Sequence, residues 1–353
     1  MAAAGLFGTL IPLIGQSYRG PDRAVAFAVW GSVAGIGGAA GTVVGGLLAQ
    51  FVSWRWIFLG AVPICLAVGV LAVTALPRIP RRNTTLDLPG VVTLIIAASA
   101  VTFGVITAGE QGWTAPLPLV ALGVGVIALG GFLLAERRSV APLLPVTLMR
   151  SRPFAGLLLA AGGYFFAAFG LLPALSLWLQ QRAGLGALAT ALVITTQQVG
   201  FVATSALAGR HLPGMRMRHT IGVGTLIVGL GDLGLAAGSA TSWPALVPGL
   251  VVTGIGAGLV SPVLPAAALA AAPEDQAGAA SSAANCARQL GLALGIAVLG
   301  STYHQNGDAL APVFLVAAAA ALAAGAVAVA LLGAGRVTAP TTVRPESAIG
   351  TQQ

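Results

Sequence analysis

The stretch GPDRAVAFAVWGSVAGIGGAAGTVVGGLLAQ, residues 20–50, decides the fold class of this chain. After Asp22 and Arg23 it carries no charged residue up to residue 50. About twenty mostly apolar residues are enough for a helix to cross the hydrocarbon core of a bilayer. The many glycines and alanines are typical of membrane helices, because small residues let helix backbones approach closely. The stretch therefore predicts a membrane-spanning helix.

Similar apolar runs, separated by short polar connections, recur along the chain. By the same length rule we predict spanning helices at residues 26–50, 57–76, 88–109, 117–135, 154–178, 188–208, 219–239, 244–270, 277–299 and 309–333. A shorter apolar segment, 1–16, is a further candidate. The chain is thus predicted to be all-α, a polytopic membrane helix bundle whose first partner is the lipid bilayer.

The composition supports a membrane protein over a soluble one. Charged residues make up 7% of the chain, against about 25% in soluble domains, and the mean hydropathy is +0.94. The formal net charge of +8 would suggest a nucleic-acid partner in a soluble protein. Here the arginines flank apolar spans, so membrane topology explains them and no nucleic-acid partner is expected.

The arginines also predict an orientation. All seventeen basic residues are arginines, and most lie in alternate connections or in the C-terminal tail, whereas the opposite connections contain Arg55 and Arg182. Arginine favours the cytoplasmic side of short loops. We therefore predict a multi-pass protein of the plasma (inner) membrane with a cytoplasmic C-terminus. Counting the spans back from a cytoplasmic C-terminus places Met1 outside the cell. No basic residue beside Met1 would orient the first segment, so we expect further helices upstream of it.

An internal repeat is suggested by residues that recur at one constant spacing. Pro12 recurs as Pro265, Asp22 as Asp275 and Gly38 as Gly291. The spans concerned are predicted to run in the same direction, and parallel repeats relate the halves of many transporters. Chance matching in a chain rich in alanine and glycine is the alternative explanation.

Three stretches carry a resemblance to a known family: GPDRAVAFAVWGSVAGIGGAAGTVVGGLLAQ at 20–50, SWRWIF at 53–58 and SSAANCARQLGLALGIAVLG at 281–300. They resemble the major facilitator superfamily, in particular its fourteen-helix drug:proton antiporter branch (the EmrB/QacA type). The resemblance covers nearly the whole chain and implies two look-alike bundles with an inserted helix pair between them. It also implies that the family's first three helices are absent, an N-terminal truncation.

On this resemblance the chain divides into four parts. They are a remnant of the N-terminal bundle at 1–76, an inserted two-helix unit with cytoplasmic flanking loops at 77–153, a C-terminal six-helix bundle at 154–333 and a disordered cytoplasmic tail at 334–353.

The function implied is secondary active transport: proton-coupled efflux of lipophilic or cationic drugs by alternating access between the two bundles. The partners would be protons and a small lipophilic or cationic substrate, with the oligomeric state left open. The alternative is a truncated protein of the same family that inserts but does not transport. No nucleophile–base constellation, cofactor motif or metal-ligand spacing stands out, so an enzyme, a cofactor and a metal site are not expected.

Asp232 is the acidic residue that lies deep in a predicted span. A charge at that depth is costly, so such residues usually face a cavity or a partner. A carboxyl group that binds and releases protons there could couple transport to the proton gradient, or it could pair with a cationic substrate. A hydrogen-bonded structural aspartate is the alternative.

Polar and aromatic residues in two other spans are candidates for the substrate path. Gln197 and Gln198 lie in the middle of a span, where amide groups need partners and so should face the interior. Tyr164, Phe165 and Trp178 give the 154–178 helix an aromatic side that suits flat lipophilic cations. Ordinary core packing and an interfacial tryptophan are the alternatives.

The resemblance marks residues of the 26–50 helix as the family's antiporter motif. The corresponding residues are Gly37, Gly41, Thr42, Gly45 and Gly46, with Thr42 where the family has proline. The glycines recur so as to form a smooth groove for a facing helix. Threonine is expected to bend the helix only slightly, by bonding back to the preceding turn. Ordinary small-residue packing is the alternative to a gating role.

A cytoplasmic gate is the last candidate site. Arg288 and Gln289 match the family's R-Q-L-G run, and Asn285 precedes them by one helical turn. Arg288 could pair with an acid such as Asp275 in one state and release it in another, with Asp22 at the repeat-related position. The alternative is that Arg288 extends its charge to the membrane interface.

Overall fold

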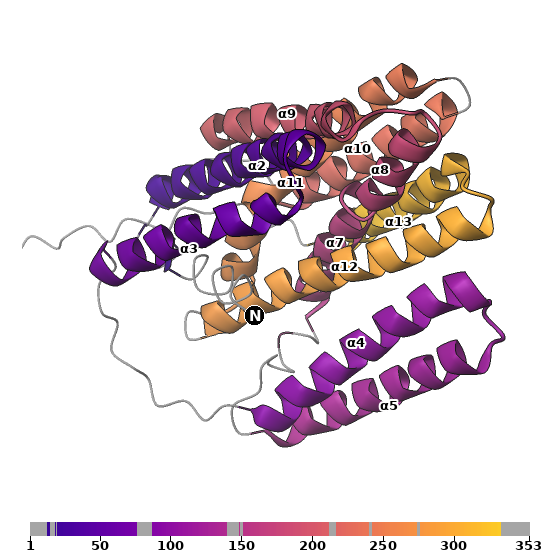
Figure 1. Ribbon diagram of the computed structural model, residues 1–353. Coiled ribbons are helices and arrows are strands. Elements are labelled where there is room, and N and C mark those ends of the chain that lie inside the picture. Colours follow the sequence, from indigo (N-terminus) through magenta and orange to yellow (C-terminus); the bar gives the residue numbers. More distant parts are fainter. Residues whose placement is uncertain are drawn as a thin grey trace, which may run out of the picture.

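Helices make up the regular structure of the protein (Figure 1). The computed structural model describes residues 13–14, 18, 20–75, 87–139, 148, 151–211, 217–239, 242–273 and 276–332. Within these ranges there is no β-strand. Ten helical segments of the described chain are long and apolar enough to cross a membrane. The all-α, polytopic fold predicted from the apolar runs is confirmed.

The first part of the chain forms four long helices. They are α2 (Gly20–Phe51), α3 (Arg55–Ala75), α4 (Leu88–Gln111) and α5 (Pro116–Arg138). The cap of α4 is explicit in the sequence, since Asp87 Oδ1 accepts a hydrogen bond from the Gly90 amide at 3.0 Å. Helix α3 is apolar along most of its length, and its side chains are exposed; the Val73 side chain, for example, is 84% exposed.

The second part of the chain forms the larger group of helices. They are α7 (Arg152–Ala168), α8 (Leu172–Gln181), α9 (Ala187–His211), α10 (Met217–Gly238), η1 (Trp243–Leu246), α11 (Val247–Ala270), α12 (Ala277–Gln305) and α13 (Leu310–Leu331). Helix α10 packs between α11 and α13, while α7 packs against α12 and α13. Helix α2 lies along α9 and also contacts α11, so it joins this group.

The span predicted at 154–178 is not one continuous helix. Helix α7 ends at Ala168, a turn follows, and α8 begins at Leu172. Pro173 stands in the first turn of α8, where it has no amide hydrogen to bond to the carbonyl one turn earlier. Gly170 lies at the turn itself, and a Cβ there would lie 2.7 Å from Gly295 Cα of α12. The break therefore lets α12 approach closely.

Helices α4 and α5 form an antiparallel pair at one side of the molecule (Figure 1). Gly112, with φ +91°, makes the turn between them. The pair contacts the larger group through α12. At that contact Gln305 Nε2 donates to the Ala108 carbonyl oxygen at 3.3 Å, and a Cβ on Gly109 would lie 2.6 Å from Ser301 Oγ.

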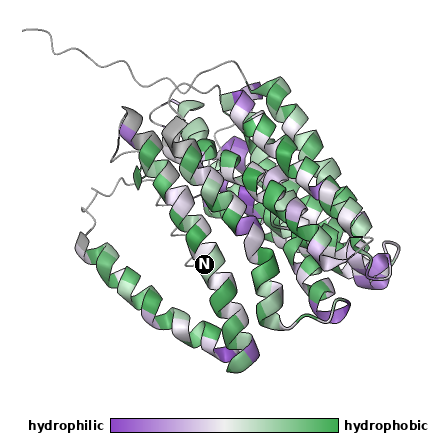
Figure 2. Ribbon diagram, turned by 90° about the horizontal axis from the view of Figure 1, so that it is seen from above, coloured by the Kyte–Doolittle hydropathy of each residue, from purple (hydrophilic) through white to green (hydrophobic). Residues whose placement is uncertain are grey.

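Most predicted spans agree with the helices within a few residues, but two ends differ. The helix predicted at 26–50 begins earlier, at Gly20. The span predicted at 277–299 continues to Gln305, because the polar residues Tyr303 and His304 still fit the last turns of α12. The predicted eleventh segment, 1–16, and the predicted tail, 334–353, lie outside the described residues apart from 13–14. Figure 2 shows the apolar residues that run along the helices.

Candidate functional site

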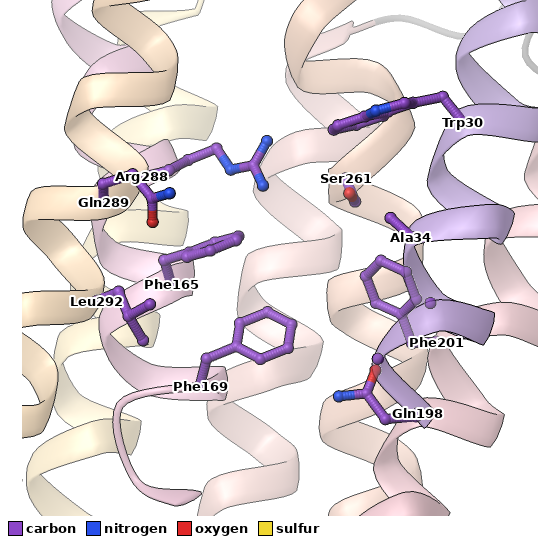
Figure 3. A pocket seen from close by; sticks show the side chains of 12 residues that line it. Trp30, Ala34, Phe165, Phe169, Gln198, Phe201, Ser261, Arg288, Gln289 and Leu292 are labelled. Atoms are coloured by element: carbon purple, nitrogen blue, oxygen red, sulfur yellow. The ribbon is translucent and has the colours of Figure 1, made fainter. Parts of the chain in front are cut away.

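A cavity of about 320 Å³ lies where α2, α9 and α11 face α7 and α12 (Figure 3). Its volume is at the lower end of the range for small-molecule sites. Aromatic rings form much of its wall, and four of its side chains are polar or charged. The lining residues are Trp30, Ala34, Gly35, Gly38, Phe165, Phe169, Gln198, Phe201, Ser261, Arg288, Gln289 and Leu292.

Small residues of α2 make room for the side chains that enter from α9. A Cβ at Gly35 would lie 2.6 Å from the Phe201 ring and from Val202 Cγ2. A Cβ at Gly38 would lie 3.6 Å from the Gln198 amide group. Because α2 carries no side chain at these two positions, Phe201 and Gln198 reach the cavity wall.

Arg288 is the charged residue among the described side chains that line the cavity. Its guanidinium carbon lies 4.4 Å from the centre of the Phe165 ring and 5.8 Å from that of Trp30. Figure 3 shows the side chain extending from α12 between these two rings. Arg288 is only 8% exposed, and it lies roughly 16 Å along α12 from Ala277 at 1.5 Å per residue.

The residues predicted to form a cytoplasmic gate do not lie together in one site. Arg288 and Gln289 line the cavity, and Asn285 is buried nearby on α12 with no partner for Oδ1 among the described residues. Asp22 is exposed at the start of α2. Asp275 lies outside the described residues, so its pairing with Arg288 stays a prediction.

The two glutamines predicted on the substrate path have different roles. Gln198 lines the cavity. Gln197 is buried and donates through Nε2 to the Ala168 carbonyl oxygen at 2.6 Å, at the end of α7. That bond satisfies a carbonyl group freed by the break between α7 and α8, so Gln197 joins two helices.

The aromatic candidates also separate. Phe165 lines the cavity, while Tyr164 lies behind it, fully buried and edge-on to Phe165 with ring centroids 4.8 Å apart. Trp178 belongs to α8 and packs partly buried against the core, away from the residues that line the cavity.

Some lining residues were not singled out from the sequence. They are Trp30, Ala34, Phe201, Ser261 and Leu292. Trp30 carries the clearest signal, since it is the one tryptophan in a helix made largely of small residues. Ser261 and Leu292 carry none, because serine and leucine are ordinary residues of apolar helices.

Asp232 lies away from the cavity, buried between α10 and α11. Its Oδ1 accepts a hydrogen bond from Thr253 Oγ1 at 3.1 Å. Its Oδ2 has no hydrogen-bond partner among the described residues. The carboxyl group is thus held through one oxygen and does not line the cavity.

The predicted motif glycines of α2 differ in their surroundings. Gly37 and Gly41 have no heavy atom of the described structure within 4 Å of an added Cβ. A Cβ at Gly45 would only touch Ile57 Cδ1, at 4.0 Å, whereas one at Gly46 would lie 2.6 Å from Ala191 Cβ of α9. Thr42 Oγ1 donates to the Gly38 carbonyl at 2.8 Å, so its bond to the preceding turn is confirmed.

A second hollow, of about 580 Å³, lies between α2 and α9. Its wall is almost entirely apolar. Gln198 lines both this hollow and the cavity that contains Arg288.

The arrangement is suited to binding and not to bond-making chemistry. Among the described residues, no group of three or more histidine, cysteine, aspartate or glutamate side chains could hold a metal ion. The cavity offers aromatic faces, amide groups, a hydroxyl group and a guanidinium group in a membrane-embedded helix bundle. Such a set can hold an aromatic molecule by stacking and by hydrogen bonds.

Comparison with known families finds that one family matches most of the chain. Residues 1–296, and in an overlapping match residues 157–352, correspond to the Major Facilitator Superfamily.

Curated relatives with similar sequences are resistance and transport proteins of bacteria. The chain is 34% identical to the puromycin resistance protein pur8 of Streptomyces alboniger, over 84% of this chain and 60% of that protein. It is 33% identical to the probable actinorhodin transporter of Streptomyces coelicolor, over 85% of this chain and 55% of that protein. It is 29% identical to the multidrug resistance protein Stp of Mycobacterium tuberculosis, over 85% of this chain and 56% of that protein.

The chain thus spans between 55% and 60% of the length of these relatives. Among solved structures, it is similar to the human organic anion transporter MFSD10 (TETRAN), with a TM-score of 0.46 and 18% sequence identity, over 93% of this chain and 82% of that one.

Proposed function

Because the chain belongs to the Major Facilitator Superfamily, we propose that it exports lipophilic compounds from the cell in exchange for protons. The observation that carries the proposal is the aromatic cavity enclosed by membrane-length helices from both parts of the chain. The names of its relatives, a puromycin resistance protein, a probable actinorhodin transporter and a multidrug resistance protein, support export. Membership in a family of transporters also agrees with the prediction that the chain is a transporter and not an enzyme.

Alternating access is the mechanism we propose for this export. The cavity lies between α2, from the part of the chain at 1–76, and the helices α7, α9, α11 and α12 of the proposed C-terminal bundle (Figure 3). A movement of one bundle relative to the other would open the cavity to one face of the membrane and then to the opposite face.

Asp232 is the proposed proton carrier. It is buried in a spanning helix, and one of its carboxyl oxygens has no partner among the described residues. Since Asp232 does not line the cavity, proton and substrate would bind at separate places. Their binding would then be coupled through the helices α10 and α11.

The drug:proton antiporter branch is the proposed position of the chain within its family. The antiparallel pair α4–α5, which packs on α12 from outside, supports this placement, because that branch inserts two helices between its halves. The proposed division remains 1–76, 77–153, 154–333 and 334–353. The proposed location is the plasma membrane with a cytoplasmic C-terminus.

Transport is tested with everted membrane vesicles that contain the chain. Three fluorescent probes with the same flat ring system are offered: pyrenemethanol, which is neutral, pyrenesulfonate, which is an anion, and pyrenemethylammonium, which is a cation. An inside-acid pH gradient should drive uptake of at least one probe, and nigericin, which dissipates the gradient, should abolish it.

Vesicles without the chain provide the control for passive partitioning. If none of the three probes is taken up above that control, the chain does not transport. The alternative function, a membrane protein that inserts but is inactive in transport, would then be favoured.

A further inference from the structure

We propose that the cavity selects aromatic compounds that carry an anionic group, and that Arg288 binds that group. The inference rests on the proposed export function and names the substrate class of the same cavity. It departs from the cationic substrates that the family resemblance implies.

The cavity contains a built binding group for an anion. Arg288 is only 8% exposed, and its side chain points into the cavity between Trp30 and Phe165 (Figure 3). Its Nε has no hydrogen-bond partner among the described residues. An arginine held inside a membrane span is costly and generally marks a functional site. A planar guanidinium group matches the geometry of carboxylate and sulfonate oxygens.

The charge of Arg288 is not compensated within the described structure. The other lining residues of the cavity are uncharged, with Gln198, Ser261 and Gln289 as the polar ones. Asp308 pairs with Arg182, not with Arg288, and contacts His304 at the α12–α13 connection. The buried acids Asp87, Glu136 and Asp232 do not line the cavity, and Asp232 bonds to Thr253 between α10 and α11.

The same contacts disfavour a cationic substrate. A cation would be attracted to aromatic faces, but the guanidinium group of Arg288 already lies against Phe165 and Trp30. A second positive charge in the cavity would meet Arg288 in a water-poor environment, where repulsion is strong. An anion would instead pair with it.

The remaining walls fit the aromatic part of the ligand. Phe165 and Phe169 lie with ring centroids 4.8 Å apart, and Phe169 and Phe201 lie 6.4 Å apart. In Figure 3 these rings follow one another below the guanidinium group of Arg288. A flat ring system could therefore lie among them while its charged group reaches Arg288.

The test measures binding without any proton gradient. The full chain is purified into nanodiscs of zwitterionic phosphatidylcholine, so that the lipid does not favour either charge. Equilibrium dialysis then gives the affinity for pyrenesulfonate and for pyrenemethylammonium, corrected with empty nanodiscs. We expect pyrenesulfonate to bind at least about tenfold more tightly, as charge complementarity predicts.

Three variants assign the preference to one residue. Arg288→Gln should reduce the preference to about threefold or less, whereas Arg288→Lys, which keeps the charge but not the planar group, should retain part of it. Arg55→Gln removes the same charge from an exposed position outside the cavity and should leave the preference unchanged.

Two results would overturn the inference. One is wild-type protein that binds pyrenesulfonate no more tightly than pyrenemethylammonium, including the case in which neither binds. The other is a preference that persists in Arg288→Gln. The wild-type comparison decides the question even where a variant does not fold.

The export function can fail independently of this inference. Anion binding that depends on Arg288 without uptake into vesicles would contradict export and keep the anion site. Gradient-driven uptake of pyrenemethylammonium without anion preference would keep export and contradict the anion site.

Discussion

Two charged residues buried in spanning helices, Arg288 and Asp232, dominate the chemistry of the protein at the scale of single residues. Each is costly in a bilayer, yet their surroundings differ. Arg288 points into an aromatic cavity, and Asp232 is held by Thr253 between two helices. Their separation suits a transporter in which substrate and proton bind at different places.

Asp232→Asn should abolish uptake driven by the pH gradient, because an amide cannot carry the proton. Binding of pyrenesulfonate in nanodiscs should stay within about twofold of wild type, since Asp232 does not line the cavity. Vesicle uptake and equilibrium dialysis measure the two effects. Asp308→Asn, a change at a partly exposed acid, is the control and should keep uptake. Gradient-driven uptake that survives in Asp232→Asn would remove this residue from the coupling mechanism.

Thr253→Val should destabilise the protein by about 0.6–1.7 kcal/mol, from the mean to the largest value measured for hydrogen bonds between membrane helices. The change preserves shape but removes the hydroxyl group that donates to Asp232. Thr302→Val is the matched control, since the Thr302 hydroxyl group bonds to Val298 of its own helix. Thermal unfolding in one detergent compares them. Equal stability of the two variants would mean that the Thr253–Asp232 bond contributes nothing measurable.

Close contacts between glycines determine how α7 and α12 pack, at the scale of helices. A Cβ at Gly291 would lie 2.6 Å from Gly162 Cα, and one at Gly295 would lie 3.1 Å from Gly170 Cα. The two backbones therefore touch at two levels, and larger side chains would separate them. Because Phe165 and Arg288 extend from these same two helices, the close packing also sets the width of the cavity.

Gly291→Ala should destabilise the protein by about 1–3 kcal/mol, the usual cost of overpacking a close contact. Gly300→Ala on the same helix is the control, because no atom of the described structure lies within 4 Å of its added Cβ. That change should be neutral or stabilising by up to about 1 kcal/mol, since alanine favours a helix over glycine. Thermal unfolding measures both, and a neutral Gly291→Ala would contradict the close contact.

The arrangement of the whole molecule joins segments that are far apart in the chain. Helix α2 packs on α9 and α11, and the α4–α5 pair packs on α12. The cavity consequently has walls from α2 as well as from the later helices. Exposed arginines at helix ends predict how this bundle is oriented in the membrane.

Cysteine labelling tests that orientation at the scale of the whole molecule. In a chain with Cys65→Ser and Cys286→Ser, the variant Arg138→Cys should react with a membrane-impermeant maleimide only in everted vesicles. Arg182→Cys should react in intact cells. Both positions are exposed at the ends of helices. Labelling of both from the same side would show that the predicted topology is wrong.

Much of the fold could be predicted from the sequence because spanning a membrane is a local requirement. A long apolar run must close its backbone hydrogen bonds within itself, so its length alone indicates a helix. The runs from residue 26 to residue 331 accordingly agree with the observed helices. The break between α7 and α8 was missed because an apolar run continues across Gly170 and Pro173.

The sequence by itself determined that the chain forms membrane-length helices and that Asp232 and Arg288 lie inside them. Only the tertiary structure decided that Arg288 points between Phe165 and Trp30, that Asp232 lies elsewhere, and that Gly35 and Gly46, not Gly37 and Gly41, contact α9. The reason is that a helix apolar on all sides carries no periodic signal for its inner face. The face is chosen by which backbones can approach most closely.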